Sequence, residues 1–419
     1  MLTPDDAALV HRDPALPGLA LLLDPERLLD RLTGLGSDIQ AVTTTYLRYK
    51  PGISLTAGLR LSTERGESFG YAVAYGEGAD DKLAKAARYR RRPSTRAAFR
   101  ARNGCAFGVL RDCGVVVGSA ELDRELPGIA HLSLGRGAHT AERLRPLRYK
   151  PARRWVASQG PVDAPRSVVK VHRPRTVARL AGVHQALYAA GAPVADLLGV
   201  DDRRGIVRTR WLTGQPLEPG LHGPGAAWSA GNSLARLHRT PSARLHSAGR
   251  GDSTAAAVHD WLSRALEGIE TVAPELSGKA QDMANRAVGA LPADRPACLV
   301  HGDFSADQVI LRPDGAVIVD LDRARIGDPA VDLANYAANE LAARAMTGGE
   351  LHWTCADVLS GLLDGYRVGG GWPVEDALPA LTAAAMLALA VEPFRLREPG
   401  WADRLEALLD IAVTSMHSL

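Results

Sequence analysis

In the second half of the chain, residues 301–311 read His301-Gly302-Asp303-Phe304-Ser305-Ala306-Asp307-Gln308-Val309-Ile310-Leu311. A turn signal follows at Pro313-Asp314-Gly315, and then comes Val317-Ile318-Val319-Asp320-Leu321-Asp322. Short apolar runs separated by such a turn predict a β-hairpin. Each strand of this hairpin adjoins an acidic loop. We therefore expect the two acidic loops to lie side by side.

Two neighbouring acidic loops are what phosphoryl transfer from a magnesium nucleotide requires. One carboxylate lies near the attacking hydroxyl, and other oxygen donors hold the hard cation. Asp303 fits the first role, and Asp320 with Gln308 fits the second. A single loop aspartate usually caps a helix or a turn. That explanation does not account for His-Gly-Asp and the later acidic pair occurring together.

These residues resemble the Brenner motif and the metal-binding loop of the aminoglycoside phosphotransferase and choline kinase family. The features that carry the resemblance are His301-Gly302-Asp303, Gln308, Asp320, Gly327-Asp328-Pro329, Asp332-Leu333-Ala334, Leu234-Ala235-Arg236-Leu237-His238, Trp211-Leu212-Thr213-Gly214-Gln215-Pro216-Leu217 and Val169-Lys170-Val171. The resemblance covers roughly residues 145 to 415 and implies a protein-kinase-like fold by analogy.

The resemblance also implies roles for individual residues. Asp303 would orient or deprotonate the substrate hydroxyl, and Gln308 and Asp320 would hold Mg²⁺. Lys170 would contact the phosphates of ATP, while adenine would bond to the main chain near Trp211 and Leu212. Asp328 and Asp332 are expected to brace the loop or cap the following helix, and His301 to be a structural hydrogen-bonding residue.

Two features depart from the family pattern. Gln308 stands where the family usually has Asn, a substitution that the related maltokinases also look to have, together with an additional N-terminal domain. The second departure is the helix after Lys170, where the family places a Glu to pair with the lysine. Residues 173–187 contain no acidic residue, and only His184 and Gln185 stand at the expected distance. This departure opens the alternative of a catalytically weak or inactive homologue.

The front of the chain contains a repeated pattern. Arg48-Tyr49-Lys50-Pro51 returns as Arg148-Tyr149-Lys150-Pro151, and Asp13-x-x-Leu16-Pro17-Gly18 returns as Asp123-x-x-Leu126-Pro127-Gly128. A strand-like run follows each copy, with Val73 in the first where the second has Lys170. We interpret the pattern as an internal repeat, each copy a β-hairpin followed by a helix. The first copy would not bind nucleotide because it lacks the lysine.

The expected fold class is α+β, with a bilobal protein-kinase-like fold preceded by an extra β-rich domain. Residues 1–135 would form that domain, a degenerate repeat of the N-lobe. Residues 136–212 would form the β-rich N-lobe, and residues 213–419 the α-rich catalytic C-lobe.

Composition excludes several other classes of protein. A net charge of +3 over 419 residues argues against a nucleic-acid partner held by phosphate neutralisation. Four cysteines without a CxxC pair indicate neither a disulfide framework nor a zinc cage. The most apolar run, residues 381–391, is shorter than the ~20 residues that span a bilayer. We therefore expect a cytoplasmic protein without a membrane partner.

The sequence thus predicts an ATP- and Mg²⁺-dependent kinase that acts on a hydroxyl of a small sugar, aminosugar or aminoglycoside. The alternative is a nucleotide-binding kinase homologue with a regulatory role. A pocket rich in carboxylates would indicate an amine-bearing acceptor, and a polar neutral pocket a plain sugar. The acidic candidates in the α-rich lobe are Glu340, Glu350, Asp357, Asp364, Glu392, Glu398 and Asp403.

Overall fold

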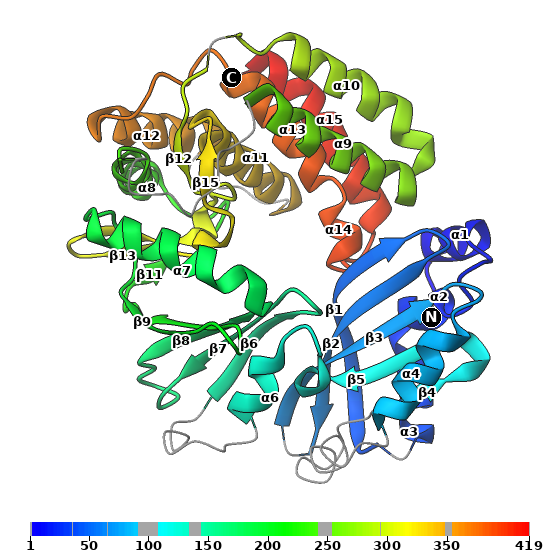
Figure 1. The fold of residues 1–419 in the computed structure, drawn as a ribbon. Helices are drawn as coiled ribbons and strands as arrows, with labels where there is room; N and C mark the ends of the chain where they lie inside the picture. Colours follow the sequence, from blue (N-terminus) through cyan, green and yellow to red (C-terminus); the bar gives the residue numbers. More distant parts are fainter. Residues whose placement is uncertain are drawn as a thin grey trace. The chain divides into compact units, whose positions relative to one another are not determined.

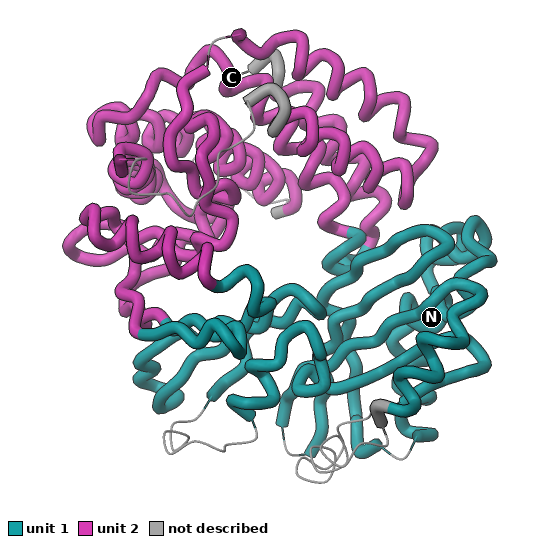
Figure 2. The backbone as a smooth tube through the Cα atoms, in the orientation of Figure 1, with its two compact units in different colours: residues 1–177, 199–208, 394–399 teal, residues 178–198, 209–393, 400–419 magenta. Residues whose placement is uncertain are grey.

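The computed structural model describes residues 2–35, 37–64, 66–90, 108–133, 144–241, 254–293, 295–347 and 354–418. The chain divides into two compact units, coloured teal and magenta in Figure 2. Unit 1 comprises residues 1–177, 199–208 and 394–399, and unit 2 comprises residues 178–198, 209–393 and 400–419. The chain thus passes between the units several times.

Unit 1 is built mainly from two five-stranded sheets (Figure 1). The first sheet contains β1 (Ile39–Lys50), β2 (Ser54–Thr63), β3 (Gly66–Tyr75), β5 (Val115–Ser119) and β4 (Gly108–Leu110). The second contains β6 (Leu144–Lys150), β7 (Arg154–Gln159), β8 (Ser167–His172), β10 (Ile206–Arg210) and β9 (Leu197–Asp201). Among the described residues, the helices that belong wholly to this unit are α1 (Pro4–Arg12), α2 (Leu19–Leu23), α3 (Pro25–Gly34), α4 (Asp80–Arg90) and α6 (Pro127–Ser133).

The two sheets have the same strand order. In each, three consecutive strands form an antiparallel meander, and the fifth strand in sequence lies between the third and the fourth. A helix follows the third strand in both, namely α4 in the first and α7 (Pro174–Ala189) in the second. Each copy therefore contains more than the expected hairpin and helix, because two further short strands follow the helix and join the same sheet.

The repeated sequence motifs make the same hydrogen bonds in both sheets. Asp13 Oδ2 accepts the Tyr49 hydroxyl at 2.7 Å and the Gly52 amide at 2.9 Å. Asp123 Oδ2 accepts the Tyr149 hydroxyl at 2.8 Å and the Ala152 amide at 2.7 Å. Residues 52 and 152 both have positive φ angles, 64° and 55°. Within each copy, the aspartate of the first motif therefore fixes the tight turn that follows the tyrosine of the second motif.

The strand register places Val73 and Lys170 at equivalent positions. Val73 pairs with Thr56 on β2, and Lys170 pairs with Val156 on β7. Thr56 in turn pairs with Arg48, and Val156 with Arg148, the first residues of the two repeated tetrapeptides. The first sheet thus carries an aliphatic side chain where the second carries an ammonium group.

A shared hydrophobic core joins the two sheets within unit 1. Phe69 of β3 packs with Tyr149, Trp155, Val169 and Val171 of the second sheet, and the Phe69 and Tyr149 ring centroids lie 6.1 Å apart. Leu126 and Ile129, from the segment that connects the sheets, complete the same cluster. Burial of this apolar surface is the main force that holds the sheets together.

The segment 394–399 supplies a buried ion pair to unit 1. Arg397 Nη1 and Nη2 donate to the two carboxylate oxygens of Asp6 at 2.8 and 2.7 Å, and Nη2 also donates to the Leu23 carbonyl at 3.1 Å. The Asp6 side chain is almost fully buried. Two parallel hydrogen bonds of this kind are among the strongest polar contacts in proteins. Residues near the end of the chain therefore stabilise helices at its beginning.

Unit 2 is largely helical and contains a few short strands. Its helices are α8 (Pro224–His238), α9 (Thr254–Val272), α10 (Ser277–Gly289), α11 (Ala330–Thr347), α12 (Cys355–Val368), α13 (Leu378–Leu389) and α15 (Trp401–Ser418), with α14 (Glu392–Arg395) at the boundary with unit 1. Its strands are β11 (Gln215–Pro216), β12 (Cys298–Val300), β13 (Val309–Arg312), β14 (Gly315–Ile318) and β15 (Arg325–Gly327). Helix α8 packs on α12, and α13 packs on α11 and α15.

The structure is of the mixed α+β class that the sequence predicts. Among the described residues, one helical stretch, Leu378–Arg395, is long and apolar enough to cross a membrane. Most of it, 72%, is buried inside the structure. A core helix has the same length and composition, so this stretch is weak evidence for a membrane span.

Candidate active site

Two antiparallel strand pairs bring the acidic loops together. β12 pairs with β15, and β13 pairs with β14. Residues 301–308 connect β12 to β13, and residues 319–324 connect β14 to β15. Because both ends of one loop are hydrogen-bonded to the ends of the other, the loops must run side by side. The predicted hairpin is present, and β12 with β15 extends the same arrangement.

Hydrogen bonds cross directly between the loops. The Val319 amide donates to the Gln308 carbonyl at 2.9 Å, and His301 Nε2 lies 2.8 Å from the Val319 carbonyl. Arg323 Nη1 donates to Asp303 Oδ1 at 3.0 Å. The structure therefore joins the loops that carry Asp303, Gln308 and Asp320, the three residues that the sequence selected from this region.

Asp303 is accessible to a ligand. Its side chain is 52% exposed, and its arginine partner Arg323 is 61% exposed. An ion pair this exposed contributes only about 0–1 kcal/mol to stability, so it orients the carboxylate without fixing it. Asp303 thus combines a defined position with freedom to contact a substrate hydroxyl.

At Gly302 the lack of a side chain leaves room for Arg323 and Arg325. Its φ is +79°, a backbone conformation that favours glycine. A Cβ atom at this position would lie 2.3 Å from Arg325 Nη1 and 2.6 Å from the Arg323 carbonyl. The absence of a side chain at position 302 therefore lets the second loop approach the residue next to Asp303.

Asp332, at the start of α11, anchors the backbone of the first loop. Its buried carboxylate accepts the His301 amide at 2.6 Å and the Gly302 amide at 2.7 Å. His238 Nε2 lies 3.0 Å from the same carboxylate, and His238 Nδ1 lies 2.7 Å from the Tyr366 hydroxyl. Burial acts to raise the pKa of Asp332, but the hydrogen bond and charge of His238 outweigh it and leave that pKa below its usual value. Asp332 braces the loop, as the sequence predicts.

Asp328 has a similar structural role. Its carboxylate receives a forked pair of hydrogen bonds from Arg295, at 2.9 and 3.2 Å, and one from the Ala330 amide at 2.9 Å. The side chains of Asp328 and Arg295 are both buried. Asp328 therefore fixes the start of α11 and has its charge balanced within the protein.

The two expected metal ligands fit a magnesium ion chemically. Gln308 donates its amide nitrogen to Asp307 at 3.2 Å, which leaves the amide oxygen as the group that could face a cation. Asp320 has a left-handed backbone, φ 64° and ψ 50°, a strain of a kind that concentrates at functional sites. The described residues contain no cluster of three or more His, Cys, Asp or Glu suited to a metal. Magnesium commonly takes only one or two protein ligands beside phosphates and water.

The nucleotide-binding residues expected from the resemblance lie in different units. Lys170 is half-buried on β8 in unit 1, between the buried Val169 and Val171. Trp211 and Leu212 are half-buried in unit 2, in the segment that connects β10 to β11. β11 pairs with β13, so this segment leads directly to the hairpin of the acidic loops.

Sequence reasoning missed the contacts that α7 makes with the second loop. Arg179 donates to the Ala324 carbonyl at 3.2 Å and to the Asp322 carbonyl at 3.1 Å. His184, one of the two residues at the expected distance from Lys170, has Nε2 2.6 Å from the Ala195 carbonyl. The sequence draws attention to this helix only for residues that could hold Lys170, whereas its Arg179 fixes the loop that follows Asp320.

Replacing Arg179 with alanine is expected to lower catalytic activity about ten- to a hundredfold, because two charge-assisted hydrogen bonds to the loop are lost. The loss should appear mainly as a higher magnesium requirement in steady-state kinetics. Arg175→Ala, an exposed arginine of the same helix, is the matched control. Equal activity of the two variants would show that α7 does not position the loop.

Comparison with known proteins agrees with this geometry. The sequence profile of a phosphotransferase enzyme family matches residues 152–378, more than half of the chain. No curated protein sequence matches the chain significantly.

Among solved structures, the chain is similar to a choline/ethanolamine kinase family protein from Mesorhizobium loti, with 16% identity, a TM-score of 0.49, and coverage of 70% of this chain and 95% of that one. It is also similar to a macrolide 2'-phosphotransferase from Brachybacterium faecium, with 20% identity, a TM-score of 0.43, and coverage of 69% and 98%. A glucosamine kinase gives 18% identity, a TM-score of 0.47, and coverage of 75% and 91%.

The profile match includes both acidic loops and confirms the family that their residues resemble. The chain therefore belongs to the phosphotransferase enzyme family.

Proposed function

We propose that this protein transfers the γ-phosphate of ATP to a hydroxyl group of a small sugar, aminosugar or aminoglycoside. The observation that carries the proposal is the hydrogen-bonded pair of loops holding Asp303, Gln308 and Asp320. It supplies an accessible carboxylate for the hydroxyl and, beside it, oxygen donors for a cation. Phosphoryl transfer relies on such positioning and charge stabilisation.

In this proposal Asp303 accepts the proton of the attacking hydroxyl, and Arg323 orients its carboxylate. Gln308 and Asp320 would hold Mg²⁺, which when bound neutralises charge on the phosphates. Lys170 would contact the phosphates, and the main chain at Trp211 and Leu212 would bind adenine. Asp332 keeps the His301 and Gly302 amides in place, so that Asp303 stays aligned.

We also infer that residues 1–135 are a degenerate repeat of the N-lobe and bind no nucleotide. The equal strand orders and the matching contacts of Asp13 and Asp123 support the repeat. Val73, at the register position of Lys170, supports the lack of nucleotide binding. Residues 136–212 and 213–419 would then be the two catalytic lobes, in a protein that acts in the cytoplasm.

Acceptor-stimulated ADP release, measured over a panel of sugars, aminosugars and aminoglycosides at several magnesium concentrations, tests the proposed reaction. Asp320→Asn is expected to lower the rate at least about a hundredfold, because a metal contributes several kcal/mol to transition-state stabilisation. Gln308→Ala should raise the magnesium requirement. Asp314→Asn changes an exposed carboxylate of the same hairpin and should leave the rate unchanged.

Nucleotide binding that does not depend on magnesium, with no ADP release for any acceptor, would contradict the proposal. That outcome would instead support the regulatory, catalytically inactive homologue.

A further inference from the structure

The second sheet of unit 1 has one face that packs in the core and one that does not. Cross-strand partners in β6, β7 and β8 share a face, and alternate residues of a strand point to opposite faces. One row of partners lies in the hydrophobic core shared with the first sheet and consists of Tyr149, Trp155 and Val171. The opposite face, here called the Lys170 face, has the rows Arg145–Ser158–Val168, Arg148–Val156–Lys170 and Lys150–Arg154–His172.

The Lys170 face is strongly cationic. Its cations are Arg145, Arg148, Lys150, Arg154 and Lys170, and none of the three strands contains an Asp or a Glu. In the first sheet, the rows equivalent to those of Lys170 and His172 are Arg48–Thr56–Val73 and Lys50–Ser54–Tyr75. These two rows contain two cations, where the second sheet has four. The additional positive charge therefore belongs to the second sheet, and it favours an anionic ligand.

Arg148 is the cation of this face that shares a row with Lys170. Only Val156 lies between them, so two strand spacings, about 10 Å, separate their Cα atoms. Arg148 is exposed, and it makes no hydrogen bond or ion pair with any residue that the structure describes. Lys150, by contrast, has its ammonium group 5.1 Å from the centroid of the Tyr46 ring. Arg148 is therefore available to a ligand that also contacts Lys170.

The recurrence of this arginine in the repeat does not make its role structural. In each copy the tyrosine that follows the arginine contacts the aspartate that fixes the turn. Arg48 is half-buried, whereas Arg148 is exposed. Arg48 also shares its row with Val73, which carries no charge. The two arginines thus have the same register but different surroundings.

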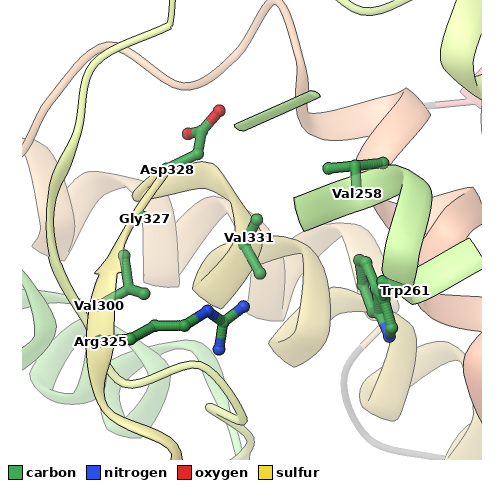
Figure 3. Close-up of a pocket in the computed structure, with 7 residues that line it drawn as sticks. All are labelled: Val258, Trp261, Val300, Arg325, Gly327, Asp328 and Val331. Atoms are coloured by element: carbon green, nitrogen blue, oxygen red, sulfur yellow. The ribbon is translucent and has the colours of Figure 1, made fainter. Parts of the chain in front are cut away.

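A small pocket in unit 2 offers no alternative site for a phosphate group (Figure 3). It contains Arg325 of β15 and lies next to Val300, the residue before the first acidic loop. Its lining, which includes Val258 and Trp261 of α9, is almost wholly apolar. The pocket has room for about one water molecule, so neither a phosphate group nor a sugar fits in it.

The acidic residues that would have indicated an amine-bearing acceptor do not line this pocket either. Glu340 is buried and accepts the Gly220 amide at 2.9 Å, and Asp357 forms the capping box of α12. Asp364 pairs with Arg367 at 2.8 Å, and Glu350 lies outside the described residues. The contacts of Glu340, Asp357 and Asp364 are thus made within unit 2.

We propose that the Lys170 face binds the phosphate chain of the nucleotide with two cations, and that Arg148 is the second cation beside Lys170. The inference deepens the proposed function and rests on it, because it concerns the nucleotide of the same reaction. A guanidinium group donates parallel hydrogen bonds to two phosphate oxygens, whereas an ammonium group acts as a point charge. Arg148 is a binding residue and takes no part in proton transfer. Because a triphosphate has more charge than one cation balances, the pair favours ATP over AMP.

Isothermal titration of the full chain with ATP or AMP, in the presence of magnesium, measures this preference independently of catalysis. We expect the parent to bind ATP about tenfold or more tightly than AMP, since hydrogen bonds to charged groups contribute at least that much. Arg148→Gln should weaken ATP binding about ten- to a hundredfold for the same reason. It should change AMP binding little, because Lys170 alone suffices for a single phosphate. Arg148→Lys keeps the charge and should retain part of the affinity for ATP.

Arg48→Gln is the matched control, because it makes the same substitution at the equivalent position of the first sheet. Its affinity for ATP should equal that of the parent. The thermal unfolding midpoints of both variants show whether they fold. An arginine with only a structural role would lower the unfolding midpoint and weaken ATP and AMP binding together.

Equal ATP affinities of the parent and Arg148→Gln would overturn the inference, and so would equal losses of ATP and AMP affinity. The two proposals fail separately. Arg148-dependent ATP binding without acceptor-stimulated ADP release would leave the assignment of Arg148 standing and refute the kinase proposal. ATP binding and ADP release that are unchanged in Arg148→Gln would do the opposite. A parent protein that binds no nucleotide would refute both.

Discussion

Asp303→Asn is expected to reduce kcat for acceptor phosphorylation by about 10²–10⁴-fold, the range that a general base contributes. Asparagine keeps the shape of the side chain but cannot take the hydroxyl proton. The fold should be unaffected, because the exposed contact of Asp303 with Arg323 contributes little to stability. Steady-state ADP release and the thermal unfolding midpoint measure the two effects.

Asp364→Asn provides the control for this experiment. Asp364 is an exposed carboxylate of α12 that also pairs with an arginine, so the substitution removes the same charge away from the loops. Its kcat should equal that of the parent. If Asp303→Asn were as active as Asp364→Asn, the assignment of Asp303 as the base would be wrong.

Asp332→Ala is expected to lower the free energy of unfolding by about 3–5 kcal/mol, the cost of removing one partner from a buried charged network. The His301 and Gly302 amides and His238 would all lose their acceptor. Urea denaturation measures the loss. Asp332→Asn keeps one oxygen acceptor and should be less destabilised. An alanine variant within about 1 kcal/mol of the parent would contradict the bracing role.

The lowered pKa of Asp332 adds a pH dependence with a defined sign. Because the folded-state pKa lies below the unfolded value of about 3.9, the stabilisation is present above that pH and is lost as the pH falls toward the folded-state value. The parent should therefore lose stability below about pH 4 more steeply than Asp332→Asn does. Parallel acid-denaturation curves would contradict this explanation.

The parts of the site that the sequence predicted are local. Apolar runs on both sides of Pro313-Asp314-Gly315 form the β13–β14 hairpin, and the turn residues fix where it reverses. Asp303, Gln308 and Asp320 follow or precede these strands within a few residues. The family was predictable for the same reason, because its most specific motifs lie in this short segment. Their roles in the reaction stay predictions.

The residues that the sequence did not predict act over long separations. Arg179 contacts carbonyls more than 140 positions along the chain, and Arg325 of β15 and Trp261 of α9 line one small pocket although they are far apart in sequence. No periodic pattern marks such contacts. The Asp-Arg-Ala-Arg run at 322–325 was a possible signal, since two arginines beside an acidic loop are unusual neighbours for a metal site.

The internal repeat could be predicted only in part from the sequence. Its motifs were visible, but the reason for their recurrence was not, because it requires Asp13 to meet Tyr49 and Asp123 to meet Tyr149. Of the last two strands of each sheet, only β10 was visible in the sequence, as a strand-like run over residues 205–211. β4 and β9 are short, and no sequence pattern indicates that the fifth strand of each sheet lies between the third and the fourth.

The place of residues 394–399 in unit 1 has a consequence for synthesis on the ribosome. A nascent chain emerges from its amino terminus, yet Asp6 acquires its Arg397 partner only after residue 397 has been synthesised. At translation rates of about 5–20 residues per second, roughly 10 to 40 s separate residue 208 from residue 397. Residues 1–208 are therefore made well before the segment that completes unit 1, and during that interval Asp6 lacks the arginine that balances its charge.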